Sequence, residues 1–239
     1  MTRNIVSVAA ALLGAGALVT GCNFEQPDAG CIVQDASFAN WYAKYDLTEA
    51  PTGAGCESTI LKGEPLGVFK FVNPEKAGEG KLTIRPFGLA SRATRDPGDP
   101  YLQTAVGSLQ DEPVDNFCSA TNFAEATVNA GPRAEDAAAE IPGEAATVIT
   151  YQFENVQVYT APRAPGTQLK GQLTYTRDGC TSKYAVRAIW PSVSCVPGSS
   201  EPRDNCGEGS GVNPDFNVEC DAELERCVPV GNIPAFKQE

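Results

Sequence analysis

The chain has 239 residues, with 18 Lys and Arg against 30 Asp and Glu, and it contains no histidine. The acidic balance and the lack of any basic run argue against nucleic-acid binding, which needs clustered Lys and Arg. The absence of histidine excludes Ser-His-Asp and Cys-His catalytic sites and histidine-ligated metal centres.

The first 21 residues have the layout of an export signal. Arg3 precedes an uncharged apolar run from Ile5 to Val19 that is 15 residues long, whereas a membrane-spanning helix needs about 20 residues. Small residues close the run, as they do at a signal-peptide cleavage site. We therefore predict a signal peptide over residues 1–21.

The end of this segment is more specific. Val19-Thr20-Gly21-Cys22 resembles the lipobox of bacterial lipoproteins. The resemblance implies a diacylglycerol on the Cys22 sulfur, cleavage after Gly21 and, usually, acylation of the new amino terminus. Two or more acyl chains hold a protein stably on a membrane, whereas one does so only weakly. Asn23 stands where an inner-membrane retention signal would have aspartate, which favours the outer membrane. The alternative is an ordinary signal peptide followed by a chance cysteine.

The predicted mature chain is acidic and rich in cysteine. Without residues 1–21 it has 218 residues, with 17 Lys and Arg against 30 Asp and Glu, a net charge of −13. We expect a lipidated tether over residues 22–30, a β-domain over 31–193 and a cysteine-rich C-terminal segment over 194–239.

Eight cysteines remain once Cys22 is assigned to lipid. In an exported protein an even set predicts disulfides, here four. Metal binding is disfavoured, because the chain has neither a CxxC motif nor a histidine. Cys220 and Cys227 enclose only six residues and form the easiest loop to close. Cys180 and Cys195 are disfavoured as a pair, because a predicted strand between them would hold them roughly 30 Å apart. The eight are Cys31, Cys56, Cys118, Cys180, Cys195, Cys206, Cys220 and Cys227.

The body of the chain predicts short strands. In residues 40–47, Trp41, Ala43, Tyr45 and Leu47 alternate with Tyr42, Lys44 and Asp46. The spacing of the aromatics also fits a helix, but the β-propensity of Trp and Tyr favours a strand. Alternation predicts further strands over 67–73, 81–87, 145–161, 167–176 and 181–190.

Asp178-Gly179 between the last two of these runs predicts a hairpin, because both turn positions need a positive φ. Together the strands predict an all-β fold, either an antiparallel β-sandwich or a partly open barrel, with a disulfide-rich C-terminal tail. Residues 111–145 are interpreted as a long connection that holds at most a two-turn helix over 134–140, limited by Pro132 and Pro142.

The C-terminal segment supplies a second resemblance. Residues 175–186, 190–195 and 209–228, above all Asn213-Pro214-Asp215-Phe216, resemble small cysteine-rich lipoproteins of myxobacteria, including the MlpA type. What the resemblance implies is a location, without an established activity and without functional residues beyond the lipid-bearing cysteine.

Candidate binding residues are few. Trp41, Tyr42 and Tyr45 form an aromatic concentration that would stack on a sugar or anchor an interface if it were exposed, although core packing is the simpler interpretation. Acidic loops at 95–100 and 201–208 leave calcium open as an alternative. No cofactor and no catalytic residue is predicted. The main hypothesis is a lipid-anchored envelope protein with a structural or interaction role; the alternative is a lipoprotein that captures a glycan or small molecule.

Overall fold

The computed structural model describes residues 30–34, 40–73, 75–76 and 79–238. The predicted signal peptide and most of the tether, including Cys22, lie outside these residues. No helix in the described ranges is long and apolar enough to cross a membrane.

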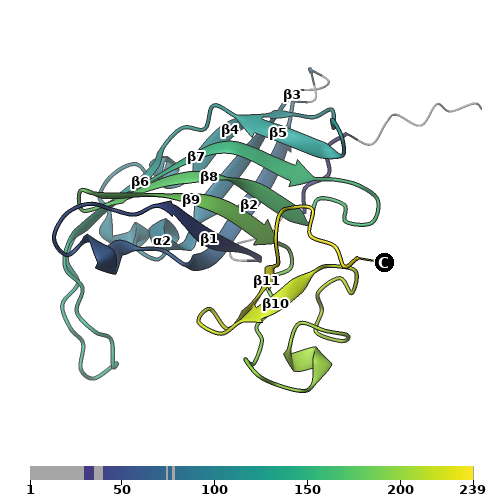
Figure 1. Cartoon of the computed structure of the whole chain (residues 1–239). Coiled ribbons are helices and arrows are strands. Elements are labelled where there is room, and N and C mark those ends of the chain that lie inside the picture. Colours follow the sequence, from purple (N-terminus) through teal and green to yellow (C-terminus); the bar gives the residue numbers. More distant parts are fainter. Residues whose placement is uncertain (1–29, 35–39, 74, 77–78, 239) are drawn as a thin grey trace, which may run out of the picture.

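The described chain is built mainly of strands (Figure 1). The strands are β1 (Trp41–Glu49), β2 (Gly63–Val72), β3 (Glu79–Pro86), β4 (Ala105–Gln110), β5 (Phe117–Thr121), β6 (Ala126–Ala130), β7 (Thr147–Tyr159), β8 (Gln168–Arg177), β9 (Cys180–Ile189), β10 (Val218–Asp221) and β11 (Arg226–Pro229). The helices are α2 (Phe87–Ala90) and the 3-10 turns η1 (Cys56–Thr59), η2 (Ala93–Arg95), η3 (Pro100–Gln103) and η4 (Pro202–Asp204).

Nine strands form one antiparallel sheet in the order β5-β4-β3-β2-β1-β9-β8-β7-β6. The sheet curls, because β5 pairs with β4 on one side and with β7 on the other. The β4–β5 pairing is confined to Ser108–Thr121 and Leu109–Ala120, so the curled sheet is partly open. The prediction of an all-β fold is confirmed. Of the two architectures predicted, β-sandwich and partly open barrel, the structure has the barrel-like one.

The inside of the curled sheet is the main core. In β1, the alternation expected from the sequence places Trp41, Ala43 and Tyr45 inside, each at most 4% exposed. Tyr151 and Tyr175 add an edge-to-face contact with ring centroids 5.0 Å apart, a geometry that stabilises aromatic pairs beyond their buried area. The three consecutive strands β7, β8 and β9 pair as predicted, and Asp178 and Gly179 have φ of 52° and 85° in the turn.

The interpretation of residues 111–145 was partly wrong. Two strands, β5 and β6, lie within this stretch, and the proposed helix over 134–140 is instead a tight hairpin. Asp136 and Ile141 exchange two backbone hydrogen bonds, and the Asp136 carboxylate accepts from the N–H groups of Ala138 and Ala139. Because short Asp side chains bond to nearby backbone groups, they favour turns over helix interiors.

The C-terminal segment packs against the sheet as a small second layer (Figure 1). Its strands β10 and β11 form a two-stranded sheet of their own. A second hydrophobic cluster joins Phe216, Ile233 and Ala235 of this segment to Tyr159 and Ile189 of the large sheet. Tyr42, which points outward from β1, is 6% exposed, and Arg226 of β11 lies over its ring.

Candidate functional site

The chain enters the fold at Cys31, nine residues after the predicted lipid-bearing cysteine. Cys31 is joined by a disulfide to Cys118 of β5. Its N–H donates to the backbone oxygen and the carboxylate of Asp111, each at 2.9 Å, and its carbonyl accepts from the Lys70 ammonium. Lys70 also pairs with Asp111. A covalent bond and a charged pair therefore fix the start of the described chain to one end of the sheet.

The other disulfides complete the pairing of all eight cysteines. Cys56 is bonded to Cys180, which joins η1 to the first residue of β9. Within the C-terminal segment, Cys195 is bonded to Cys220 and Cys206 to Cys227. Cys180 and Cys195 are separated by β9 and are not bonded to each other, as the strand length predicted.

The preference for a Cys220–Cys227 pair was wrong. The two residues do lie opposite each other across β10 and β11, but each is bonded to a cysteine from the loop that precedes β10. A six-residue loop is easy to close, yet closing it constrains little of the unfolded chain. The observed pairs instead attach the irregular residues 194–207 to the β10–β11 hairpin.

The predicted aromatic cluster belongs to the protein interior. Trp41, Tyr42 and Tyr45 are all at most 6% exposed. The Trp41 indole N–H donates to the Gln34 carbonyl at 2.8 Å, and Tyr42 is covered by the C-terminal segment. These side chains form no exposed aromatic surface, because the strand alternation turns two of them inward and the C-terminal segment covers the third. Of the two interpretations, core packing is the one that fits this burial.

A buried polar cluster lies beside Tyr45. The Glu64 carboxylate accepts from the Tyr45 hydroxyl at 2.9 Å and from the Gly88 N–H at 2.6 Å, and Tyr151 bonds to it as well. Burial raises the pKa of Glu64, against the lowering effect of these hydrogen bonds and of Arg92. Glu64 alternates with buried Leu66 and Val68 along β2, so the period-two pattern could have marked it from the sequence. The surrounding groups satisfy Glu64 and enclose it.

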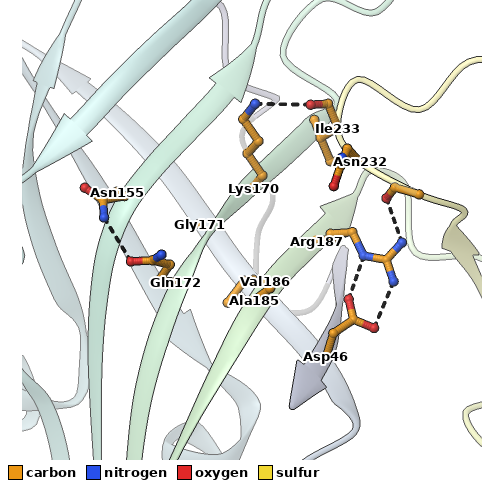
Figure 2. Close-up of a pocket in the computed structure, with 11 residues that line it drawn as sticks. Asp46, Asn155, Lys170, Gly171, Gln172, Ala185, Val186, Arg187, Asn232 and Ile233 are labelled. Carbon is orange, nitrogen blue, oxygen red and sulfur yellow. Dashed lines mark hydrogen bonds and ion pairs between the residues drawn. The ribbon is translucent and has the colours of Figure 1, made fainter. Parts of the chain in front are cut away.

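An open cleft of about 520 Å³ lies on the outer side of the sheet, beside the residues that follow β11 (Figure 2). On one side, Arg187 forms a two-pronged ion pair with Asp46 at 2.7 and 2.9 Å and donates to the carbonyls of Pro229 and Gly231. Lys170 donates to the Ile233 carbonyl at 3.2 Å. These contacts attach the C-terminal segment to β8 and β9.

The opposite side of the cleft is formed by a bulge in β7. Asn155 and Val156 together stand opposite Gly171 of β8, and Asn155 has a φ of 50°. A Cβ on Gly171 would lie 3.0 Å from the Val156 side chain, so the close approach of the two strands favours glycine. The bulge directs Asn155 toward Gln172, whose side-chain oxygen accepts from it at 2.9 Å (Figure 2). The cleft thus offers amide and charged groups suited to a polar ligand.

Of the two acidic loops considered for calcium, the one at 95–100 uses its carboxylates in hydrogen bonds to backbone N–H groups. Asp96 accepts from the N–H groups of Gly98 and Asn129, and Asp99 accepts from the Tyr101 N–H at the start of η3. In the described part of the chain, the group with metal-ligand spacing is Cys195, Cys206 and Cys227, and these three sulfurs belong to disulfides.

Comparisons with known proteins identify the family of this chain. The MlpA family model matches residues 39–191, a range that begins just before β1 and ends just after β9. A Myxococcus xanthus protein described as "Putative lipoprotein MlpA" is 48% identical over 247 residues, covering 99% of this chain and all of the relative. No solved structure matches the chain. The chain therefore belongs to the MlpA family.

Proposed function

We propose that the protein is a lipid-anchored component of the cell envelope with a structural or interaction role and no catalytic activity. The observation that carries the proposal is the Val19-Thr20-Gly21-Cys22 sequence, in which a cysteine closes a charged and then apolar leader. The relative described as a lipoprotein, identical at 48% of positions over its full length, supports it. Lipid on Cys22 would hold the folded domain at a membrane without a spanning segment.

The remaining cysteines support the same location. All eight are paired in disulfides, a use of cysteine that is typical of the periplasm and the cell surface. Asn23 after the lipid-bearing cysteine favours the outer membrane. The chain has no histidine, and its buried carboxylate Glu64 is enclosed by tyrosines, which supports a role without catalysis.

Metabolic labelling with palmitate tests the anchor. The wild type is expected to take up label and to sediment with membranes, whereas Cys22→Ala should take up none and should be released. Gln26→Ala in the tether is the matched control and should behave as wild type. A Cys22→Ala protein that remains with the membrane, beside an unlabelled wild type, would contradict the proposal.

A second candidate function is the capture of a small polar ligand such as a glycan. The cleft beside Asn155 and Gln172 favours it, because its volume of about 520 Å³ falls in the range of ligand sites. Aromatic stacking at Trp41, Tyr42 and Tyr45 does not contribute to it. Glycan-array binding by the wild type and by Gln172→Ala tests the idea: binding that survives unchanged in the variant, or no binding at all, counts against the cleft.

A further inference from the structure

Exposed apolar side chains gather at the end of the sheet where the tether enters. Ile32 follows Cys31, Phe71 and Val72 end β2, and Val114 lies between β4 and β5; they are 38%, 57%, 58% and 66% exposed. We call these four residues the tether rim. Isolated exposed apolar residues are ordinary on a protein surface, so their position relative to the tether carries the argument.

The contacts around Cys31 place the rim residues on neighbouring segments. Lys70, which precedes Phe71, donates to the Cys31 carbonyl, and Asp111, in the segment that also holds Val114, accepts from the Cys31 N–H. The backbone N–H of Ile32 donates at 3.0 Å to the hydroxyl of Thr160, the residue that follows β7. The disulfide to Cys118 fixes this arrangement.

The length of the tether limits how far the rim can lie from a membrane. Eight residues separate Cys22 from Cys31, and at about 3.3–3.6 Å each they span at most roughly 30 Å. The opposite end of the sheet carries α2, which lies across the domain from the arrowheads of β7 and β9 (Figure 1). The 3-10 turn η3 lies at the same end, because it comes just before Ala105 of β4, which pairs with Ile84 just before α2. The rim is therefore the end of the domain that a lipid on Cys22 would hold nearest the bilayer.

We propose that the tether rim is a lipid-contacting surface, on which Phe71 and Val72 enter the interfacial layer of the bilayer and orient the domain. This rests on the lipidation of Cys22 under the proposed function. Phe71 and Val72 are successive strand residues with side chains on opposite faces, and both are exposed at the end of β2. Lys81 lies opposite Phe71, and Glu79 and Asp115 add acidic groups nearby. With both signs of charge present, apolar contact rather than charge holds the rim to the membrane.

The experiment uses the full lipidated protein in zwitterionic vesicles of phosphatidylcholine and phosphatidylethanolamine. Phe71→Trp introduces an indole at the rim, and Tyr101→Trp introduces a matched one in η3 at the other end, where Tyr101 is 85% exposed. The emission of Trp41 and Trp190 is subtracted with the wild type. Nitroxide lipids labelled at a shallow depth are expected to reduce the emission of the Phe71→Trp indole, with a shift to shorter wavelength that 0.5 M salt leaves unchanged. The Tyr101→Trp indole should show neither effect.

Two failures are distinguishable. If the protein floats with the vesicles but the Phe71→Trp indole is not quenched, or is quenched no more than that of Tyr101→Trp, the rim proposal is overturned while the anchor stands. If wild type and variants all fail to float and carry no lipid label, the anchor itself is contradicted and the rim proposal falls with it.

Discussion

The curled sheet and the C-terminal segment contain two disulfides each, but they depend on them differently. The sheet has a large apolar interior, with Trp41, Leu66 and Leu82 fully buried, and its two disulfides close separations of 87 and 124 residues. The C-terminal segment shares a smaller cluster with the sheet, and its disulfides close separations of 25 and 21 residues. A large apolar core holds the first region together, whereas the second combines a smaller apolar cluster with disulfides and polar docking contacts.

The largest loss of stability is expected from removing the disulfide that closes the longest loop. Cys56→Ser with Cys180→Ser frees a 124-residue loop, which on the chain-entropy model costs about 5 kcal/mol of unfolding free energy. The sheet should nevertheless fold, because its core is unchanged. Urea denaturation followed by near-ultraviolet circular dichroism measures the loss. An unchanged urea midpoint would contradict this expectation, because it would mean that strain around the disulfide in the folded state cancels the stabilisation gained by restricting the unfolded chain.

A smaller and local effect is expected in the C-terminal segment. Cys206→Ser with Cys227→Ser opens a 21-residue separation, worth about 3 kcal/mol on the same model. Because the apolar cluster that this segment shares with the sheet is smaller than the core of the sheet, the segment should detach while the sheet stays folded. Limited proteolysis should cut between residues 196 and 215, with the cooperative unfolding of the sheet preserved. Loss of both regions in a single transition would contradict the division between them.

Acid should act on the docking of the C-terminal segment through Asp221. Although burial raises the pKa of Asp221, hydrogen bonds from Lys44 and from the N–H groups of Leu224 and Glu223 lower it overall from 3.8. Its contribution to stability is therefore present above pH 3.8 and is lost as the pH falls through the lower folded-state pKa.

Asp221→Asn tests this contact. The Asn oxygen can replace the carboxylate oxygen that accepts from the backbone, but its amide then faces Lys44, which pairs with Asp221 at 2.9 Å. We expect docking to weaken by about 1–2 kcal/mol, measured as faster hydrogen exchange at the N–H of Cys227. Glu219→Gln is the matched control, because Glu219 is more exposed and its oxygen lies 3.6 Å from Lys44. Equal effects of the two changes would argue against a specific role for Asp221.

The sheet should respond to pH in the opposite direction, by the smallest amount. Burial raises the pKa of Glu64 above 4.5, so the folded state binds its proton more tightly than the unfolded state does. Stability should fall by on the order of 1 kcal/mol as the pH rises from 4.5 through the raised folded-state pKa. Glu64→Gln should remove this slope, which chemical denaturation at several pH values measures. A slope that persists in the variant would assign it to another group.

Much of the sheet was predictable because strand alternation is local. The alternation indicated the buried face of β1 from Trp41 to Tyr45, although Leu47, which continues it, is 42% exposed. Asp178-Gly179 indicated the β8–β9 hairpin. The stretch that contains β5 and β6 was misjudged, because both strands are only five residues long and have no turn motif between them. Both strands pair with β7, which begins only at Thr147, so the curl of the sheet, and no local pattern, brings β5 and β7 together.

The sequence by itself predicted the export signal and the lipid on Cys22, and it determined the all-β class and the even set of eight remaining cysteines. Each of these follows from composition or from neighbours along the chain. Only the tertiary structure decided which cysteines bond, that Tyr42 is covered by the C-terminal segment, and that the segments of Lys70 and Asp111 meet at Cys31. These relations depend on how the sheet curls, and burial and proximity between distant residues leave no local pattern in the chain.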